Sequence, residues 1–285
     1  MAERIRRVGV VARSTNRDAV HTAVELADWL ARRNLEVALD ETTLRARRGR
    51  DAEVFDAASA YDLVVVLGGD GTLLSVARAL RAGVPILGIN LGTLGFLTEV
   101  ARTALYPSLV RVLNGEHSLE QRALLDVTVR RAGGRGASLR AFNDAVISKG
   151  ALAHIITLAL RVDGRLVTRF RSDGLIVSTP GGSTAYNLSA GGPIVHPQLP
   201  AAILTPICAH TLTLRPVVVP DKGPIEIQLE TEGEEVVLSV DGQDGGSLGG
   251  GDSITIVRSA ASVQLVRVTG LGFYDSLREK LRWGG

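Results

Sequence analysis

Cysteine is almost absent from this sequence of 285 residues, which contains only Cys208. A single cysteine excludes a framework of intrachain disulfide bonds and is typical of a reducing compartment, so we expect the cytoplasm. Apolar runs are short as well, and none approaches the ~20 residues needed to cross a bilayer. The run at 8–12 is too short for the core of a signal peptide. We therefore expect a protein that is neither exported nor membrane-anchored.

The sequence also lacks a strong charge bias and has few aromatic residues. Its 32 Lys and Arg nearly balance 30 Asp and Glu, and a net charge of +2 gives no electrostatic argument for a nucleic-acid or membrane partner. With 4% aromatic residues in a chain that is 45% hydrophobic, the core must consist mainly of Ala, Val, Leu and Ile. This length predicts one or two globular domains.

Several common active-site motifs are missing too. There is no GxxxxGKS or GxxxxGKT phosphate loop and no GxGxxG dinucleotide fingerprint. The sequence GGST around Ser183 does not form the GxSxG of a nucleophile elbow. The five histidines form no HExxH or similar pattern, so the sequence offers no set of metal ligands.

The first half of the chain alternates strand and helix patterns. Apolar runs predict strands at 5–12, 35–39, 63–67 and 84–89. Apolar residues at helical spacing predict helices at 18–33, 72–81 and 105–113. This alternation is typical of an α/β fold with a doubly wound parallel sheet. Residues 42–50 are polar and basic, which predicts a solvated surface loop or, alternatively, a loop that contacts phosphate.

From about residue 119 the apolar pattern becomes strand-like. We expect strands at 124–129, 138–148, 155–162, 166–171, 225–230, 235–240, 253–257 and 263–268. Pairs such as Asp163-Gly164 and Asp241-Gly242 predict turns between them. The sequence therefore predicts an α/β domain over 1–118 and a mostly-β domain over 119–270. A short helix at 274–283 should let residues 271–285 pack back on the first domain.

Two glycine-rich stretches follow predicted strands in the first domain. In LVVVLGGDGTLL, residues 63–74, we expect Gly68, Gly69 and Gly71 to take positive φ angles and to let a ligand approach the backbone. The helix that follows directs unpaired N–H groups at the same point, which suits phosphate, and Asp70 places a carboxylate there. The second stretch, GINLGTLGFLTE at 88–99, should lie on the same carboxyl edge of the sheet.

The second domain contains two further candidate stretches. Residues 172–193, SDGLIVSTPGGSTAYNLSAGGP, combine a strand at 175–177, a glycine turn, Thr184 at a helix N-cap and Tyr186, which can stack on a base. The alternative is a structural turn at a domain junction. The pair Asn143-Asp144 interrupts an apolar strand and can bind ribose hydroxyls, although an Asx turn or a bulge explains an isolated pair equally well.

These motifs together resemble those of NAD kinases. GGDGT, NLGTLGF, the Asn143-Asp144 pair and DGLIVSTPGGSTAYNLSAGGP occur in the family's order over nearly the whole chain, and the closing LREKLRW resembles bacterial members. GGDGT alone would indicate only the wider group that includes phosphofructokinase and the diacylglycerol and sphingosine kinases. The stretch at 172–193 narrows the resemblance to NAD kinases.

The resemblance implies an activity and an architecture. Family members transfer the γ-phosphoryl of ATP, or in some members of polyphosphate, to the 2′-hydroxyl of the adenosine ribose of NAD, which gives NADP. It also implies an N-terminal α/β domain and a C-terminal domain of β-sandwich type, joined by a cleft, in a homodimer or homotetramer. A divalent cation, most simply Mg²⁺, would be carried by the ATP phosphates rather than by a protein cage.

The resemblance further implies roles for individual residues. Asp70 would be the catalytic acid/base that takes or orients the proton of the 2′-hydroxyl. Phosphate would be held by Gly68, Gly69, Gly71 and Thr72. The base pocket would be bordered by Phe96, and ribose hydroxyls would be bound by Asn143 and Asp144. The adenine and nicotinamide sites would be lined by Thr184, Ala185, Tyr186, Asn187, Leu188 and Ser189. Family ligand positions also fall on His154, Arg171, Asp173 and Gln243.

The chain departs from the family pattern at two positions. Family members often have Asn-Glu where this chain has Asn143-Asp144, and Thr or Ser where it has Gly181. A shorter acid and a missing hydroxyl leave the affinity and the choice of phosphoryl donor open. Two other functions compete with an NAD kinase: a lipid or small-alcohol kinase that shares GGDGT, and a non-catalytic NADP-binding sensor. The lack of an amphipathic membrane-facing stretch argues against the lipid kinase.

Overall fold

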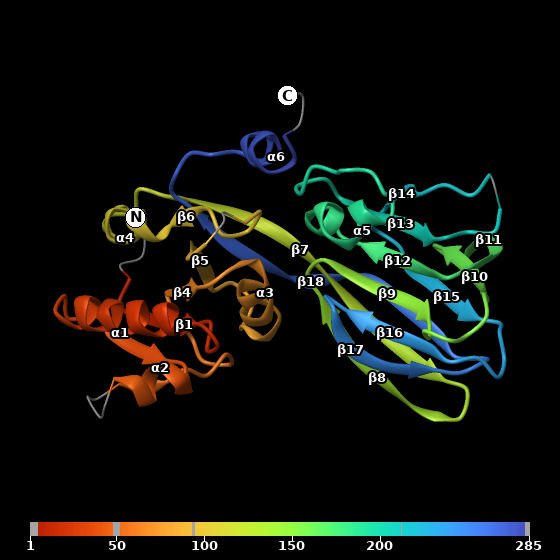
Figure 1. Ribbon diagram of the computed structural model, residues 1–285, viewed down its shortest axis with the longest axis horizontal. Helices are drawn as coiled ribbons and strands as arrows, with labels where there is room; N and C mark the ends of the chain where they lie inside the picture. The colour runs from red at the N-terminus through yellow and green to blue at the C-terminus, as the bar shows by residue number, and fades with distance from the viewer. Residues whose placement is uncertain (1–4, 48–51, 93–94, 212, 283–285) are drawn as a thin grey trace. The chain divides into compact units, whose positions relative to one another are not determined.

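The chain folds into two compact units. The computed structural model describes residues 5–47, 52–92, 95–211 and 213–282. Unit 1 comprises Met1–Gln121 and Val263–Gly285, and unit 2 comprises Arg122–Ser262 (Figure 1). The sequence placed these boundaries after residues 118 and 270. Across the described part of the chain, no helix has the length and apolar character needed to cross a membrane.

Unit 1 is the predicted α/β unit with a parallel sheet. Its strands are β1 (Arg7–Ala12), β2 (Glu36–Leu39), β3 (Glu53–Val54), β4 (Leu63–Leu67), β5 (Pro85–Asn90) and β6 (Val100–Ala101). Its helices are α1 (Arg17–Ala31), α2 (Glu41–Ala46), α3 (Asp70–Ala79), η1 (Arg102–Ala104), α4 (Leu105–Leu113) and α6 (Phe273–Leu281). The strands pair in the order β5-β4-β1-β2-β3, all parallel, which confirms the expected doubly wound arrangement.

Both faces of this sheet are covered, so its central strands are apolar on both sides. Val8, Val10 and Val65 pack with the buried residues of α1 and α4 on one face. On the other face α3 approaches β5 so closely that a Cβ on Gly88 would lie 2.7 Å from Leu73 Cδ1. Figure 1 shows the helices on either side of the strands of unit 1. The carboxyl ends of β1, β4 and β5 therefore meet at one edge, where ligands bind in such folds.

Unit 2 consists mainly of antiparallel strands. They are β7 (Ser118–Arg131), which begins in unit 1, β8 (Gly134–Ala141), β9 (Asp144–Lys149), β10 (Ile156–Val162), β11 (Arg165–Ser172), β12 (Gly174–Ser178), β13 (Ala201–Ile207), β14 (Val217–Pro220), β15 (Ile225–Leu229), β16 (Val236–Val240), β17 (Gln243–Leu248) and β18 (Ser253–Arg267), which ends in unit 1. One sheet runs β14-β13-β12-β9-β16-β17, and β11-β10-β15-β18 belong to a second. A shared apolar core joins strands of both sheets. The expected mostly-β fold is confirmed.

Two parts of the local prediction were wrong. Residues 42–50 were expected to be a loop, but Glu41–Ala46 form α2, and residues 48–50 lie outside the described part of the chain. Asp40 begins this helix, because its Oδ1 accepts a hydrogen bond from the Thr43 N–H. The arginine-rich composition concealed this capping signal.

The other error concerns strand boundaries in unit 2. The expected strand at 138–148 is interrupted at Asn143 and forms β8 and β9. The two strands expected at 253–257 and 263–268 are one strand, β18. β13, β14 and β17 were not predicted, because proline and glycine interrupt their apolar patterns.

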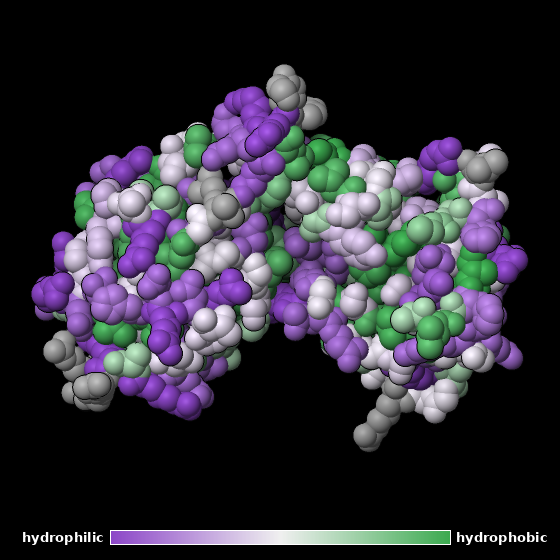
Figure 2. All heavy atoms as spheres, in the orientation of Figure 1, coloured by the Kyte–Doolittle hydropathy of each residue, from purple (hydrophilic) through white to green (hydrophobic). Residues whose placement is uncertain are grey.

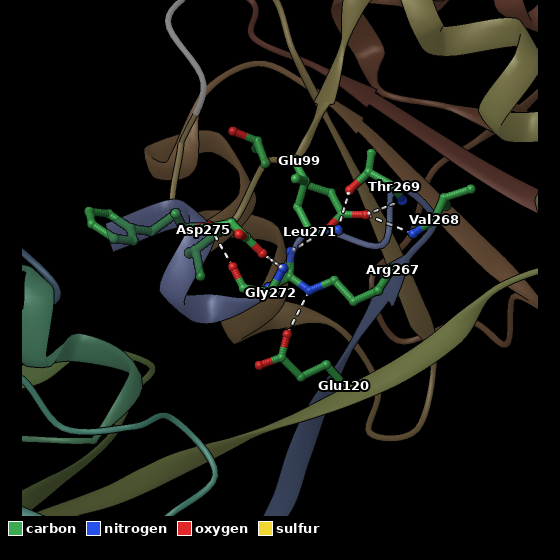
Figure 3. A network of polar contacts seen from close by, with 12 residues as sticks. Glu99, Glu120, Arg267, Val268, Thr269, Leu271, Gly272 and Asp275 are labelled. Atoms are coloured by element: carbon green, nitrogen blue, oxygen red, sulfur yellow. Dashed lines mark hydrogen bonds and ion pairs between the residues drawn. The ribbon is translucent and has the colours of Figure 1, made fainter. Parts of the chain in front are cut away.

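Ionic contacts tie the C-terminal segment to the rest of unit 1 (Figure 3). Arg267 donates from Nε to Glu120 at 2.6 Å and from Nη1 to Glu99 at 3.1 Å. The other oxygen of Glu99 accepts the Val268 N–H at 2.7 Å and the Thr269 N–H at 3.2 Å. Beyond this anchor lies α6, whose surface is mostly hydrophilic in Figure 2 and whose Leu277 is buried. Buried ionic pairs are costly to break, so we expect this cluster to hold residues 263–282 in place.

Replacing Arg267 by methionine tests this anchor. The side chains of Arg267, Glu99 and Glu120 are 15%, 9% and 17% exposed, so Arg267→Met removes a guanidinium that pairs with two largely buried carboxylates. We expect the free energy of unfolding to fall by about 3 kcal/mol in urea denaturation. Arg278→Met is the control, because Arg278 is 62% exposed beside Asp275, and its loss should cost less than about 1 kcal/mol. Equal losses in the two variants would contradict the proposed anchor.

Candidate functional site

The GGDGT loop joins β4 to α3. All five residues of β4 are buried, and α3 begins at Asp70 with Gly69 as its N-cap. The expectation of positive φ angles was wrong: Gly68, Gly69 and Gly71 are not among the glycines with positive φ. Crowding explains only the first of these glycines. A Cβ on Gly68 would lie 2.6 Å from Thr72 Oγ1, whereas Cβ atoms on Gly69 and Gly71 would have no atom of the described residues within 4 Å, their own neighbours in the chain aside.

The Asp70 carboxylate is held by the second glycine-rich stretch. Its Oδ2 accepts the Phe96 N–H at 2.8 Å. Its Oδ1 accepts the Leu97 N–H at 3.2 Å, the Thr98 N–H at 3.1 Å and the Thr98 hydroxyl at 3.1 Å. A Cβ on Gly95 would lie 1.8 Å from Oδ1, so only glycine allows this approach. The two stretches therefore share one edge of the sheet, as we expected; Thr93 and Leu94 lie outside the described residues.

A cavity of about 480 Å³ lies beside this loop, at the ends of β1 and β4. It is lined by Gly69, Gly71 and Thr72 from the predicted phosphate loop and by Arg13 and Ser14, which follow β1. Gly68 does not line it. β1 connects to β2 on one side while β4 lies on its other side, so the cavity occupies the switch point of the sheet. Sequence reasoning missed Arg13 and Ser14, although the order of strands in a doubly wound sheet would have indicated them.

In unit 2, the pair Asn143-Asp144 lies at the break between β8 and β9. Asp241 holds this break: its carboxylate accepts the N–H groups of Phe142, Asn143 and Asp144 at 2.8, 2.7 and 3.1 Å. Asp144 is 4% exposed. Burial, and then the charge of Asp241, raise the pKa of the Asp144 carboxyl to about 7. Within the described residues, neither the Asn143 amide nor the Asp144 carboxyl has a hydrogen-bond partner, so both are available to a ligand.

The stretch at 172–193 is partly a scaffold for this pair. A Cβ on Gly182 would lie 2.2 Å from the Asn143 carbonyl oxygen, and the Thr179 N–H donates to that oxygen at 2.8 Å. Ser183 exchanges two hydrogen bonds with the backbone of Val195. The buried Asn187 amide donates to the carbonyls of Ser183 and Pro193 and accepts the Thr205 hydroxyl. These contacts account for much of the glycine and hydroxyl content without a ligand.

The helix start in this stretch also differs from the expectation. Thr184 was expected at an N-cap, but it ends η2 (Gly181–Thr184), and Ala185 precedes α5 (Tyr186–Ser189). Ala185 has no side chain that could cap the helix. Tyr186 is 46% exposed, so its ring is accessible for stacking. Thr184, Ala185 and Leu188 are half-buried and Ser189 is exposed.

The remaining predicted residues lie apart from the Asn143-Asp144 pair in the sequence and have other contacts. Phe96, in unit 1, has the Lys280 ammonium 5.9 Å from its ring centre. His154 is exposed and contacts Glu234 at 2.8 Å. Asp173 lies 3.6 Å from the Lys149 ammonium. The other two, Arg171 on β11 and Gln243 on β17, are exposed. Their ligand roles stay predictions.

Known proteins match this chain over nearly its whole length. It is 45% identical to the NAD kinase of Geotalea daltonii over 98% of this chain and 99% of that one. It is also 45% identical to the NAD kinase of Syntrophotalea carbinolica, with the same coverage. The crystal structure of yeast NADH kinase complexed with NADH matches with a TM-score of 0.92 and 25% identity, over 100% of this chain and 89% of that chain. An NAD kinase from Archaeoglobus fulgidus, in complex with ATP, matches with a TM-score of 0.75 and 29% identity, over 98% and 100%.

Two family models divide the chain as the fold does. The ATP-NAD kinase N-terminal domain matches residues 8–117, and the ATP-NAD kinase C-terminal domain matches residues 142–268. An α/β unit and a β unit with these matches define the class of the protein: it is a kinase. More particularly, the chain belongs to the NAD kinase family.

The burial of Asp144 predicts a pH-dependent stability. Because the folded state raises its pKa to about 7 from 3.8, the folded protein binds this proton more tightly than the unfolded chain, and stability falls as pH rises from about 4 to about 7. The loss is on the order of 4 kcal/mol. Asp144→Asn should remove it, so the melting temperature of the variant should exceed that of the wild type by more at pH 8.5 than at pH 4.5. Asp144→Glu, which keeps an ionisable group, is the control. A pH-independent difference between Asp144→Asn and the wild type would contradict the prediction.

Proposed function

We propose that this chain phosphorylates NAD, using ATP to give NADP and ADP. The 2′-oxygen of the adenosine ribose forms the new bond to the γ-phosphorus, the bond to the β,γ-bridging oxygen breaks, and the hydroxyl proton is lost. Membership of the NAD kinase family supports this function. The strongest structural support for this function is the position of the Asp70 carboxylate. Residues 96 and 97 hold it beside a cavity at the switch point of the parallel sheet. Nothing in the comparisons favours a lipid or small-alcohol kinase.

Asp70 is proposed as the catalytic residue that orients the acceptor hydroxyl and takes its proton. An ionised carboxylate offers about two acceptor sites on each oxygen. Oδ1 already accepts three hydrogen bonds, whereas Oδ2 accepts one, from Phe96. Oδ2 therefore has the free capacity for a hydroxyl. Phosphoryl transfer depends mainly on such positioning and on charge stabilisation.

The cavity is proposed to hold the donor phosphates. Gly69 and Gly71 leave open space where side chains would otherwise project, and the N-cap of α3 provides no side chain to satisfy the N–H groups of its first turn. The Arg13 Nε donates to Thr15 at 3.1 Å, and no carboxylate within the described residues pairs with its guanidinium. A cation and a helix N-terminus beside one cavity suit a polyanion.

A divalent cation is proposed to accompany the donor. In the described residues no group of three His, Cys, Asp or Glu side chains could hold a metal ion, so the ion is proposed to arrive on the donor phosphates. Mg²⁺ bound in this way would neutralise charge on the phosphoryl group. We also propose that the protein acts in the cytoplasm as a homodimer or homotetramer. Polyphosphate is proposed as a second possible donor beside ATP.

Unit 2 is proposed to bind the dinucleotide through the Asn143-Asp144 pair. Neither side chain has a hydrogen-bond partner in the part of the chain that the structure describes, and an amide with a carboxyl can bind two neighbouring ribose hydroxyls. We retain Thr184, Ala185, Tyr186, Leu188 and Ser189 as proposed contacts to the bases and His154, Arg171, Asp173 and Gln243 as proposed peripheral contacts. Asn187 is proposed to support this segment, since its amide is fully engaged.

Replacing Asp70 by asparagine tests the proposed function. Wild-type protein with NAD, ATP and Mg²⁺ should form NADP, measured with an NADP-specific dehydrogenase. Asp70→Asn removes the proton acceptor and should lower kcat by at least about 100-fold. Circular dichroism should show that the variant is folded. Absence of NADP in the wild-type reaction would exclude the function, and full activity of folded Asp70→Asn would exclude the role of Asp70.

Replacing Arg13 by glutamine tests the donor cavity. The loss of a charged hydrogen bond to phosphate should raise the KM for ATP by roughly 10-fold or more, while the KM for NAD changes little. ATP and GTP should be affected alike, because the contact is to phosphate. Arg33→Gln is the matched control, since Arg33 stacks on Trp29 at the other end of α1. An unchanged KM for ATP in Arg13→Gln would place the donor elsewhere.

A further inference from the structure

A chain of buried hydrogen bonds leads away from Asp70 into unit 1. The Thr98 hydroxyl lies 3.1 Å from Asp70 Oδ1, and the Asn90 Nδ2 lies 2.9 Å from that hydroxyl. The Asn90 Oδ1 in turn accepts the Gly92 N–H at 2.7 Å. Thr98 is fully buried and Asn90 is 4% exposed. From the sequence, no role in the site was predicted for either residue.

The donor and acceptor of each of these hydrogen bonds follow from the bond between Gly92 and Asn90. A backbone N–H can only donate, so the atom of Asn90 that faces Gly92 must be the oxygen. The amide nitrogen therefore faces Thr98 and donates to its hydroxyl oxygen. Since a threonine hydroxyl has a single proton, and this oxygen accepts from Asn90, the proton is directed at Asp70. Asn90 thus fixes the orientation of Thr98, and Thr98 fixes one oxygen of the carboxylate.

We propose that Thr98, oriented by Asn90, is a positioning residue for phosphoryl transfer. It acts through Asp70: its hydroxyl and the two amides of residues 97 and 98 hold Oδ1, which leaves Oδ2 turned toward the acceptor hydroxyl. Without the Thr98 hydroxyl the carboxylate can rotate about its χ2 angle, and the free lone pair of Oδ2 loses its fixed direction. This inference rests on the proposed role of Asp70 in NAD phosphorylation.

Thr98→Val and Thr98→Ser separate the hydroxyl from the shape of the side chain. Valine keeps the volume and the methyl group that packs near Gly88 but removes the hydroxyl, whereas serine keeps the hydroxyl. We expect Thr98→Val to lower kcat by about 10- to 100-fold, the range for a misplaced catalytic group, with less than about a threefold change in the KM for NAD or ATP. Thr98→Ser should keep most of the wild-type kcat. Wild-type kcat in Thr98→Val, or an equal loss in the two variants, would overturn the proposal.

Asn90→Asp tests the direction of the chain. The carboxylate can still accept the Gly92 N–H but cannot donate to Thr98, so the Thr98 proton is drawn away from Asp70 toward residue 90. We expect a loss of kcat at least as large as in Thr98→Val, although no volume has changed. A kcat within twofold of the wild type would show that Asn90 does not orient Thr98.

A second buried threonine provides the matched control. The hydroxyl of Thr43, on α2, donates to the Asp40 carboxylate at 2.6 Å, and Thr43 is as buried as Thr98. Thr43→Val should lower stability as Thr98→Val does but leave kcat unchanged. A loss of kcat in both variants that follows the loss of stability would reduce Thr98 to a structural role.

Crystal structures of the Thr98 variants check the geometry without any assay. The Asp70 carboxylate should be rotated or disordered in Thr98→Val and unchanged in Thr98→Ser. An unmoved carboxylate in Thr98→Val would overturn the inference even if the wild type is active. Conversely, rotation of the carboxylate in a protein that makes no NADP would support the positioning and reject the proposed function.

Discussion

The hydrogen bonds from residues 96–98 to Asp70 are the constraint on which the arrangement of unit 1 depends. They link the loop after β4 to the loop after β5, two strands that are neighbours in the sheet. They require Gly95 to have no side chain, because a Cβ there would overlap Asp70. They also divide the carboxylate into one saturated oxygen and one oxygen with spare capacity. The position of a reactive group is thus determined by three backbone N–H groups together with the Thr98 hydroxyl.

The two acidic groups proposed to act in this protein have opposite surroundings. Asp70 in unit 1 is surrounded by donors that stabilise its charge. The Asp144 carboxyl in unit 2 is buried and has no hydrogen-bond partner among the described residues; its burial, and then the charge of Asp241, raise its pKa to about 7. A ligand whose ribose hydroxyls donate hydrogen bonds to Asp144 would offset the free-energy cost of burying its charged carboxylate. The unpaired acid therefore destabilises the free protein in a way that binding can offset, which is a common origin of stability–function trade-offs.

How far the sequence predicts this structure depends on how local each signal is. β4 and α4 have the predicted bounds, because a buried β-branched run and a one-sided apolar helix are decided within a few residues. The α2 helix was missed although its capping contact between Asp40 and Thr43 is local. The basic composition of residues 42–50 favoured a loop and outweighed this signal. Arg13 was missed because its place beside the glycine loop depends on which strand lies next to β4, and that is a tertiary fact. Asp241 was read as a turn residue only, since its three backbone contacts join segments about a hundred residues apart.

Glycines in the 172–193 stretch show why motif density alone does not identify ligand contacts. Gly182 is required by the fold, because a Cβ there would overlap the backbone of Asn143. Gly181 is not: its φ is not positive, and a Cβ would lie 3.4 Å from Arg122 Nη1 and 3.5 Å from Thr179 Oγ1, which are ordinary contacts. A serine or threonine would therefore fit at 181 without backbone strain. The fold therefore does not require a glycine at 181, and the absence of a hydroxyl there changes only which groups this segment can offer to a ligand.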